Sequence, residues 1–204
     1  MNTQLLHPFS QDSKSYSPKL FTISAPAGSG KTTLVKMLEQ EFPYSFQKTL
    51  SMTTRKPRKG EVSGEDYLFV SSEEFQELVA KGAFLEWIFL FGEYYGTTRL
   101  EIERIWDLGK HAIAVSDVQG AMAIRQKKPS VSIYIAPPSK EEVERRLDKR
   151  GSEEVLQRKE RLEHSTKELA MVNQFDYVIV NDHLELAYRI LKSIFIAEEH
   201  RNNL

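Results

Sequence analysis

A glycine-rich turn between an apolar run and a helical pattern constrains the fold of this chain more than any other feature. Residues 24–33 read Ser-Ala-Pro-Ala-Gly-Ser-Gly-Lys-Thr-Thr. The apolar run at 20–23 precedes the turn, and apolar residues recur at helical spacing after it, over 34–42. Strand, glycine-rich turn and helix in this order are the context of a phosphate-binding loop. The pattern therefore predicts a buried strand that leads directly into a helix N-terminus.

The chemistry of this turn suits a nucleoside triphosphate. Glycines allow successive backbone N–H groups to point at one phosphate, and the helix N-terminus adds partial positive charge. Lys31 can reach the outer phosphates, and the hydroxyl of Thr32 is placed to hold Mg²⁺. Glycine-rich turns also precede helices that bind no phosphate. The run 25–32 nevertheless fits the phosphate-loop pattern apart from Ala25, which stands at the opening glycine, and this fit favours binding. The residues expected to hold the triphosphate are Ala25, Pro26, Ala27, Gly28, Ser29, Gly30, Lys31, Thr32 and Thr33.

Composition excludes several other classes of protein. The 204 residues allow one substantial core with a small inserted subdomain. A net charge of −1 argues against broad binding to nucleic acid or to an anionic membrane, and the absence of cysteine excludes disulfides and thiolate metal sites. No apolar run approaches the roughly 20 residues that span a bilayer. We expect a cytoplasmic protein, a monomer or a homodimer, with a flexible tail over residues 1–19.

Short apolar runs predict the strands of the core. They lie at 20–25, 111–116, 131–136 and 177–180, and each is followed by a helical pattern. Because these runs are continuously apolar, they suit buried parallel strands joined by crossover helices. The predicted helices lie near 31–42, 72–81, 98–108, 118–127, 139–150, 153–172 and 183–199. The fold class is therefore α/β, with a parallel sheet flanked by helices.

The stretch 46–97 interrupts this rhythm. It is rich in aromatic and turn residues and contains Thr-Thr-Arg-Lys-Pro-Arg-Lys-Gly at 53–60. We expect a small, mostly β insertion that serves as a domain for a second substrate. Arg55 and Arg58 can converge on one dianionic phosphate through bidentate guanidinium groups. A solvated basic loop is the alternative for the same residues.

Seven segments in this order resemble guanylate kinase, a family of phosphate-loop nucleoside monophosphate kinases. These segments are Ser51–Glu61, Gly64–Tyr67, Phe84–Trp87, Tyr94–Thr97, Asp117–Gly120, Ile135–Ser139 and Ile179–Asp182. The resemblance covers about residues 20–200 and implies ATP-dependent phosphorylation of GMP, and of dGMP, with Mg²⁺. It divides the chain into a core (20–45, 98–140 and 173–200), a GMP-binding insertion (46–97) and a helical lid (about 141–172).

The resemblance assigns the insertion to GMP. Ser51, Arg55, Arg58, Tyr67 and Tyr95 match positions that hold the GMP phosphate, and Thr97 and Asp117 match positions that contact or support guanine. Glu86 is the candidate reader of the base, because an acceptor-only carboxylate complements the adjacent N1–H and 2-amino donors of guanine. Adenine would leave that carboxylate unsatisfied. The alternative for Glu86 is a charge on an edge strand that faces solvent.

The same resemblance assigns the transfer step to cationic side chains. Arg150 and Arg161 match lid residues that stabilise the transferring phosphoryl group, and Arg146 matches a lid residue that contacts the ATP phosphates. With Lys31 and Arg55, these three arginines form the predicted catalytic set. A salt-bridged surface hairpin is the alternative for the lid sequence. By the same resemblance Asn181 should lie near adenine, although Asn-Asp is also an ordinary strand-to-helix turn.

One position departs from the family pattern. Val115 stands where the family usually has an acidic residue that helps to organise Mg²⁺. Thr32 and the nucleotide phosphates then hold the ion, with Asp117 as a further candidate ligand. Two other readings stay open: an interaction module without catalysis, and a kinase of another nucleoside monophosphate. Lys31 argues against the first and Glu86 against the second, while the absence of an Asn-Lys-x-Asp motif disfavours a guanine-nucleotide switch.

Overall fold

The core is a parallel sheet of five short strands. The computed structural model describes residues 17–26, 28–139, 142, 145, 166 and 168–201. The strands are β1 (Leu20–Ser24), β2 (Phe46–Lys48), β7 (His111–Val115), β8 (Val131–Ala136) and β9 (Tyr177–Val180). Their order in the sheet is β2-β7-β1-β8-β9, and every pairing is parallel. The predicted α/β class and parallel sheet are confirmed, with β1 at the centre of the sheet. The edge strand β9 was expected to be buried, but it exposes Val178 and Val180 because no further strand or helix covers that side of it among the described residues.

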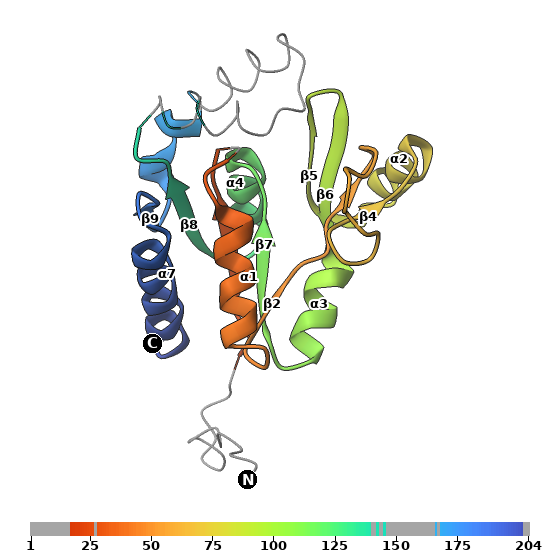
Figure 1. Ribbon diagram of the computed structural model, residues 1–204. Coiled ribbons are helices and arrows are strands. Elements are labelled where there is room, and N and C mark those ends of the chain that lie inside the picture. The colour runs from red at the N-terminus through yellow and green to blue at the C-terminus, as the bar shows by residue number, and fades with distance from the viewer. Residues whose placement is uncertain are drawn as a thin grey trace.

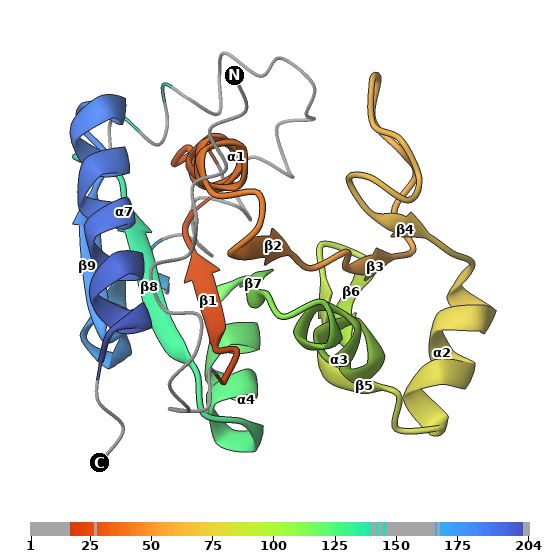
Figure 2. The ribbon, with the colours of Figure 1, turned by 90° about the horizontal axis from the view of Figure 1, so that it is seen from below.

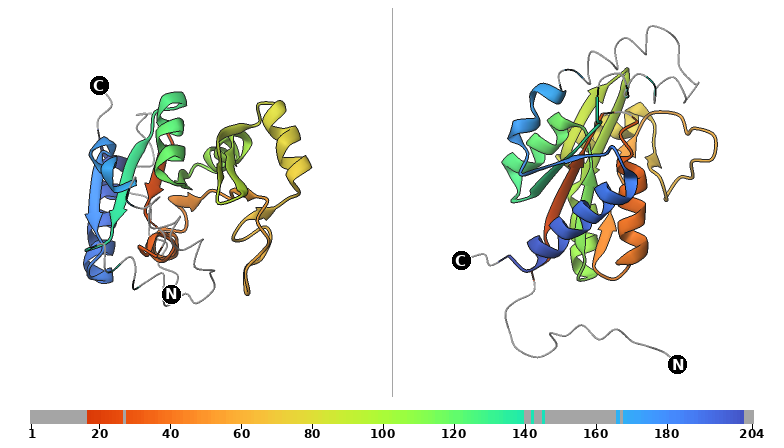
Figure 3. Two further views of the ribbon diagram at one scale, coloured as in Figure 1. Left: turned by 90° about the horizontal axis from the view of Figure 1, so that it is seen from above. Right: turned by 60° about the vertical axis from the view of Figure 1, so that its left-hand side comes forward.

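Helices cover both faces of this sheet. Helix α1 (Lys31–Glu41) and helix α7 (Leu184–Glu199) pack on one face, and α3 (Arg99–Asp107) and α4 (Val118–Lys127) pack on the other. Figure 2 shows α1 and α4 on opposite sides of the strands, and Figure 3 shows the same layers from two further directions. Alternate residues of β1 enter the two cores, because side chains of a strand point to opposite faces. The carboxyl end of β1 therefore points the phosphate loop at the N-terminus of α1.

A second, smaller sheet projects from the core. It contains β3 (Met52–Thr53), β4 (Leu68–Phe69), β5 (Phe84–Leu90) and β6 (Glu93–Thr98) in the order β4-β3-β6-β5, and α2 (Ser72–Ala80) packs against it. Strands β5 and β6 form an antiparallel hairpin. Phe91 and Gly92, with φ of 52° and 80°, form its turn, as a two-residue turn with positive φ at both positions requires. In Figure 1 this hairpin stands beside the core.

The structure shifts one predicted boundary. The insertion was expected to begin at residue 46, but β2 pairs with β7 in the core sheet, so the inserted part follows Lys48. The side chain of Trp87 is 44 % exposed, so it does not fill a core. Most of the predicted helices at 139–150 and 153–172 fall outside the described residues, apart from a helical segment at 168–170 and a 3-10 turn, η1 (Val172–Gln174).

None of the described helices combines the length and apolar character needed to cross a membrane. The longest of them, α7, buries Leu191 and Phe195 against the sheet and presents Glu185 and Arg189 on its surface. Part of its apolar face therefore packs into the core, while Leu184 and Ile190 are exposed.

Candidate active site

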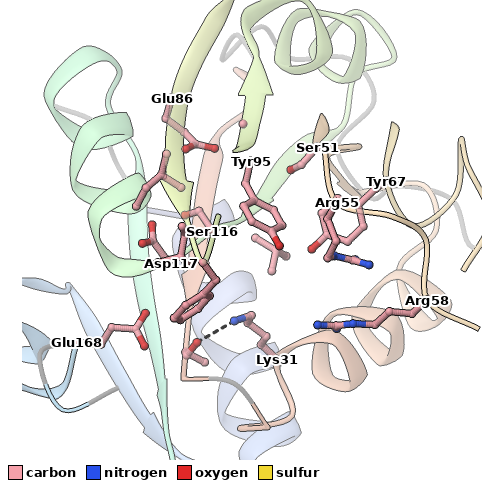
Figure 4. Close-up of a pocket in the computed structure, with 16 residues that line it drawn as sticks. Lys31, Ser51, Arg55, Arg58, Tyr67, Glu86, Tyr95, Ser116, Asp117 and Glu168 are labelled. Atoms are coloured by element: carbon pink, nitrogen blue, oxygen red, sulfur yellow. Dashed lines mark hydrogen bonds between the residues drawn. The ribbon is translucent and has the colours of Figure 1, made fainter. Parts of the chain in front are cut away.

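A pocket lies between the core and the insertion. Figure 4 shows side chains from the phosphate loop, the insertion and the end of β7 converging on it. The predicted site residues that line it are Ala25, Lys31, Ser51, Arg55, Arg58, Tyr67, Glu86, Tyr95 and Asp117. They come from segments up to 92 positions apart in the chain, between Ala25 and Asp117. The structure thus brings the predicted triphosphate loop and the predicted acceptor residues to one cavity.

The phosphate loop has the backbone geometry that its glycines allow. Gly28 and Gly30 have φ of 84° and 85°, in the left-handed region that side chains disfavour. Phe91 is the one described residue other than glycine with positive φ, so Ala25 needs no left-handed conformation. The substitution of the opening glycine by Ala25 is therefore compatible with the loop. The Nζ of Lys31 donates a hydrogen bond of 2.8 Å to the carbonyl oxygen of Ala25, which closes the loop.

Asn181 reaches the loop from the end of β9. Its side chain is 5 % exposed, and its Nδ2 donates a hydrogen bond of 2.8 Å to the carbonyl oxygen of Ser29. A Cβ atom at Gly30 would lie 2.5 Å from the same Nδ2, so only glycine leaves room for this contact. Asn181 therefore braces the loop directly, a role that its expected place near adenine did not include.

Arg55 is held from one edge by a carboxylate. Its Nη1 and Nη2 donate to the two oxygens of Glu61 at 2.8 and 3.0 Å, and Nη1 also donates to the carbonyl oxygen of Lys56 at 2.8 Å. The guanidinium lies over the ring of Tyr67, 5.4 Å from its centroid, and 5.7 Å from that of Phe69. The hydrogen bond from Arg55 lowers the pKa of Glu61, so the pair is ionised near neutral pH.

These contacts decide which donors of Arg55 face the pocket. A guanidinium has five N–H groups, and the contacts to Glu61 and Lys56 use three of them. Within the described part of the chain, the Nε–H and the second N–H of Nη2 form the other edge, which suits one bidentate oxyanion. The backbone N–H of Arg58 also donates to Glu61, at 2.7 Å, so one carboxylate organises the whole basic loop.

Glu86 is a buried carboxylate at the opposite end of the pocket. It lies on β5, is 4 % exposed, and hydrogen-bonds with Thr97 on the neighbouring strand β6. Burial, together with the weaker effect of the nearby Asp117 carboxylate, raises the pKa of Glu86 to about 7, against the opposing hydrogen bonds from Thr97. The alternative of a solvent-facing edge charge is wrong. Thr97 is fully buried behind the pocket and shares a hydrogen bond of 3.1 Å with the hydroxyl of Ser51.

Asp117 has a structural task as well. It is the N-cap of α4, and its Oδ1 accepts a hydrogen bond of 2.7 Å from the backbone N–H of Gly120. Val115 and Ser116 precede it and also line the pocket. Among the described residues, no group of three or more histidine, cysteine, aspartate or glutamate side chains is arranged to hold a metal ion.

Some predicted residues are not tested by this geometry. Thr32 and Thr33 lie exposed in the first turn of α1 and are not among the lining residues. Ala27, Arg146, Arg150 and Arg161 lie outside the described residues. The assignments of these residues therefore stay predictions.

Sequence reasoning missed two carboxylates of the site. Glu168, just before η1, is 6 % exposed and lines the pocket on the same side as Asp117 (Figure 4). Glu168 lies outside the segments that carry the family resemblance, so the sequence assigns it no role. Glu61 ends the segment Ser51–Glu61, but the resemblance gives it no role, because it assigns Arg55 to a phosphate and not to a carboxylate. The sequence did contain a signal for this role: Glu61 lies close in the chain to Arg55 and Arg58, which are expected to bind an anion.

Comparisons with known proteins agree with this site. The family model for guanylate kinase matches residues 17–198. A guanylate kinase from Chlamydia pneumoniae is 72 % identical over 197 residues, which are 97 % of this chain and 96 % of that protein. One from Protochlamydia amoebophila is 46 % identical over 182 residues (89 % and 92 %). The crystal structure of guanylate kinase from Anaplasma phagocytophilum is similar to this structure, with a TM-score of 0.71 and 33 % sequence identity. The match covers 92 % of this chain and 89 % of the Anaplasma chain.

The chain belongs to the guanylate kinase family. The predicted family is thereby confirmed over nearly the whole chain, including the insertion that carries Arg55 and Glu86.

Proposed function

We propose that this chain transfers the terminal phosphoryl group of ATP to GMP, and to dGMP, giving ADP and GDP or dGDP. The observation that carries the proposal is the shared pocket, in which Lys31 of the phosphate loop faces the arginines and Glu86 of the insertion. Two anionic substrates must meet end to end for such a transfer. A loop for one polyphosphate and a separate basic cluster for a second phosphate supply the two binding sites.

The acceptor phosphate binds to the free edge of Arg55. Because Glu61 and Lys56 occupy the other donors, the Nε–H and one Nη2–H remain for two oxygens of the GMP phosphate. Arg58, Tyr67, Tyr95 and Ser51 line the same part of the pocket and add charge and hydroxyl donors. The contacts with Glu61 fix the orientation of Arg55 before the substrate arrives, which lowers the entropic cost of binding.

The guanine base binds to Glu86. The ionised carboxylate accepts hydrogen bonds from N1–H and the 2-amino group, so binding of GMP draws the pKa of Glu86 below its value in the free protein. Thr97 hydrogen-bonds with the carboxylate of Glu86, and the carboxylate of Asp117 lies nearby. Adenine offers no such pair of donors, and the mismatch leaves a buried carboxylate unsatisfied.

The transfer itself needs positioned cations more than a general base. The attacking oxygen of GMP is already an anion, and it forms a bond to the γ-phosphorus as the bond to the bridging oxygen of ADP breaks. Charge spreads over the transferring oxygens, and Lys31 with Arg55 stabilises it. Arg146, Arg150 and Arg161 complete the catalytic set by resemblance to the family.

The residues of this site suit a magnesium ion that is held mainly by the nucleotide. The hydroxyl of Thr32 and the carboxylate of Asp117 are the protein groups that would hold it, with water in the remaining positions. Bound Mg²⁺ would neutralise charge on the ATP phosphates. The side chain of Val115 is apolar and contributes no ligand.

The proposal places the reaction in the cytoplasm, where ATP and GMP are both available. We propose that the enzyme acts there as a monomer or a homodimer. The alternative, an interaction module without catalysis, requires a phosphate loop that no longer holds ATP. The closed loop with Lys31 at its end supports the catalytic alternative.

A coupled assay of ADP release tests the proposed function. Purified protein is compared with GMP, dGMP, AMP, CMP and UMP as acceptors, with and without Mg²⁺. Turnover with GMP and dGMP that depends on Mg²⁺ is the expected result. Absence of turnover with GMP would overturn the proposal and leave the interaction module, whereas equal turnover with AMP would overturn the role of Glu86.

A further inference from the structure

The two carboxylates at the base end of the pocket meet at a glycine. Gly120 is buried in the first turn of α4, and a Cβ atom built on it would lie 3.0 Å from Oε2 of Glu86 and 3.1 Å from Oδ1 of Asp117. The Cβ of Ser116 would also be 3.1 Å away. All three distances are shorter than ordinary van der Waals contact, so any side chain here would displace its neighbours.

The helix itself gives no reason for a glycine at this position. Gly120 does not have a positive φ, so an L-residue can adopt its backbone conformation. Glycine lowers helix stability relative to alanine, and α4 would gain from the exchange if its surroundings allowed it. The reason for glycine therefore lies in its surroundings, which are the side chains of Glu86 and Asp117.

Gly120 also fixes one of these side chains directly. Its backbone N–H donates the 2.7 Å hydrogen bond to Oδ1 of Asp117, the same oxygen that an added Cβ would crowd. Glu86 lies on β5 of the insertion, and β5 packs against α4 of the core. The missing side chain thus sets how near the two carboxylates can come.

We propose that Gly120 is a specificity-determining position: its lack of a side chain leaves the space in which Glu86 and Asp117 take up the arrangement that reads guanine. This inference rests on the proposed function. An alanine here pushes the end of the flexible Glu86 side chain, so the carboxylate shifts by a few tenths of an ångström. Recognition of two adjacent donors by one carboxylate is sensitive to such a shift, whereas binding of ATP at the phosphate loop is not.

The test is the variant Gly120→Ala with GMP and IMP as acceptors, since IMP lacks the 2-amino donor of guanine. We expect KM for GMP to rise and the preference for GMP over IMP, in kcat/KM, to fall by about tenfold or more. The KM for ATP should stay at the wild-type value, and a melting temperature close to that of the wild type would show that the variant is folded. Gln119→Ala, at the exposed neighbouring position of the same helix, is the matched control and should change neither preference nor KM.

A double-mutant cycle separates specificity from packing. In a Glu86→Ala background the crowded carboxylate is absent, so Gly120→Ala should have no further effect on the GMP-to-IMP ratio. An unchanged ratio in a folded and active Gly120→Ala variant overturns the inference, and so does a loss of equal size in both backgrounds. If wild-type protein itself fails to phosphorylate GMP, the proposed function has failed instead, and the two failures are distinguishable.

Discussion

The phosphate loop and the basic loop of the insertion both offer positive charge to a phosphate, but they are constructed differently. The phosphate loop is one contiguous stretch whose glycines shape the backbone and whose Lys31 closes onto Ala25. The basic loop presents the side chain of Arg55, held by Glu61 and stacked on Tyr67. One region depends on backbone conformation and the other on side-chain contacts.

This difference predicts different sensitivities to mutation. In the phosphate loop, a new Cβ is the damaging change, because Gly30 leaves no room beside Asn181. In the insertion, the loss of a charged partner is damaging, because Arg55 and Glu86 are positioned by other side chains. Variants that affect one substrate and spare the other can test this comparison.

The largest expected effect comes from Lys31→Ala. Loss of the lysine removes the charge that faces the outer phosphates in the transition state, and kcat should fall by about 10³-fold. Binding of GMP, measured by calorimetry without ATP, should change little. Equal losses of GMP affinity and of kcat would contradict the separation of the two regions.

Glu86→Gln should raise KM for GMP by about 100-fold and leave KM for ATP unchanged, because an amide cannot accept from both guanine donors. The same change should stabilise the protein at pH 8. The pKa of Glu86 is raised from 4.5 to about 7 in the folded state. Its contribution to stability is therefore present below pH 4.5 and is lost as the pH rises through 7. Chemical denaturation at pH 8 should show a gain of roughly 2 kcal/mol in unfolding free energy.

Affinity for GMP should depend on pH through Glu86. Below pH 7 the carboxyl of the free protein is protonated, and one of its oxygens becomes a donor. It can then no longer accept from both N1–H and the 2-amino group, so affinity should fall by up to about tenfold per pH unit. The phosphate of GMP also titrates near pH 6. The variant Glu86→Gln is therefore the control, because its pH dependence comes from the phosphate and not from residue 86. An identical pH profile in both proteins would remove the carboxylate from guanine recognition.

Glu61→Gln should raise KM for GMP by about tenfold, because an amide no longer neutralises and orients Arg55 in the bidentate manner. KM for ATP should stay constant, and Glu65→Gln, at an exposed carboxylate of the same loop, is the matched control. If Glu61→Gln instead lowers KM for GMP, the carboxylate competes with the substrate for Arg55, and its positioning role is wrong.

The smallest effect is expected for Asn181→Ala. The variant loses the hydrogen bond to Ser29, so the loop becomes less ordered and KM for ATP should rise about threefold to tenfold. KM for GMP should not change. A loss of GMP binding in this variant would show that the two regions are coupled more strongly than their separate construction implies.

Much of this site could be predicted from sequence, and the reasons for the misses are physical. Periodicity located the core strands and most helices, and the family resemblance located Arg55, Glu86 and Asp117. The strands β2, β3 and β6 escaped because strands of two or three residues, or strands rich in tyrosine and glycine, form only where a neighbour pairs with them. Glu61 and Glu168 escaped because a carboxylate gains its role from the cation or cavity it meets.

The amino-acid sequence by itself determined the phosphate loop, the chemical types of the two binding regions and the family. It did so because a loop of contiguous residues carries its geometry in local backbone preferences. Only the tertiary structure decided which edge of Arg55 is open, how far the pKa of Glu86 is raised and why residue 120 is glycine. These properties depend on burial and on distances between side chains remote in the chain, and packing alone fixes both.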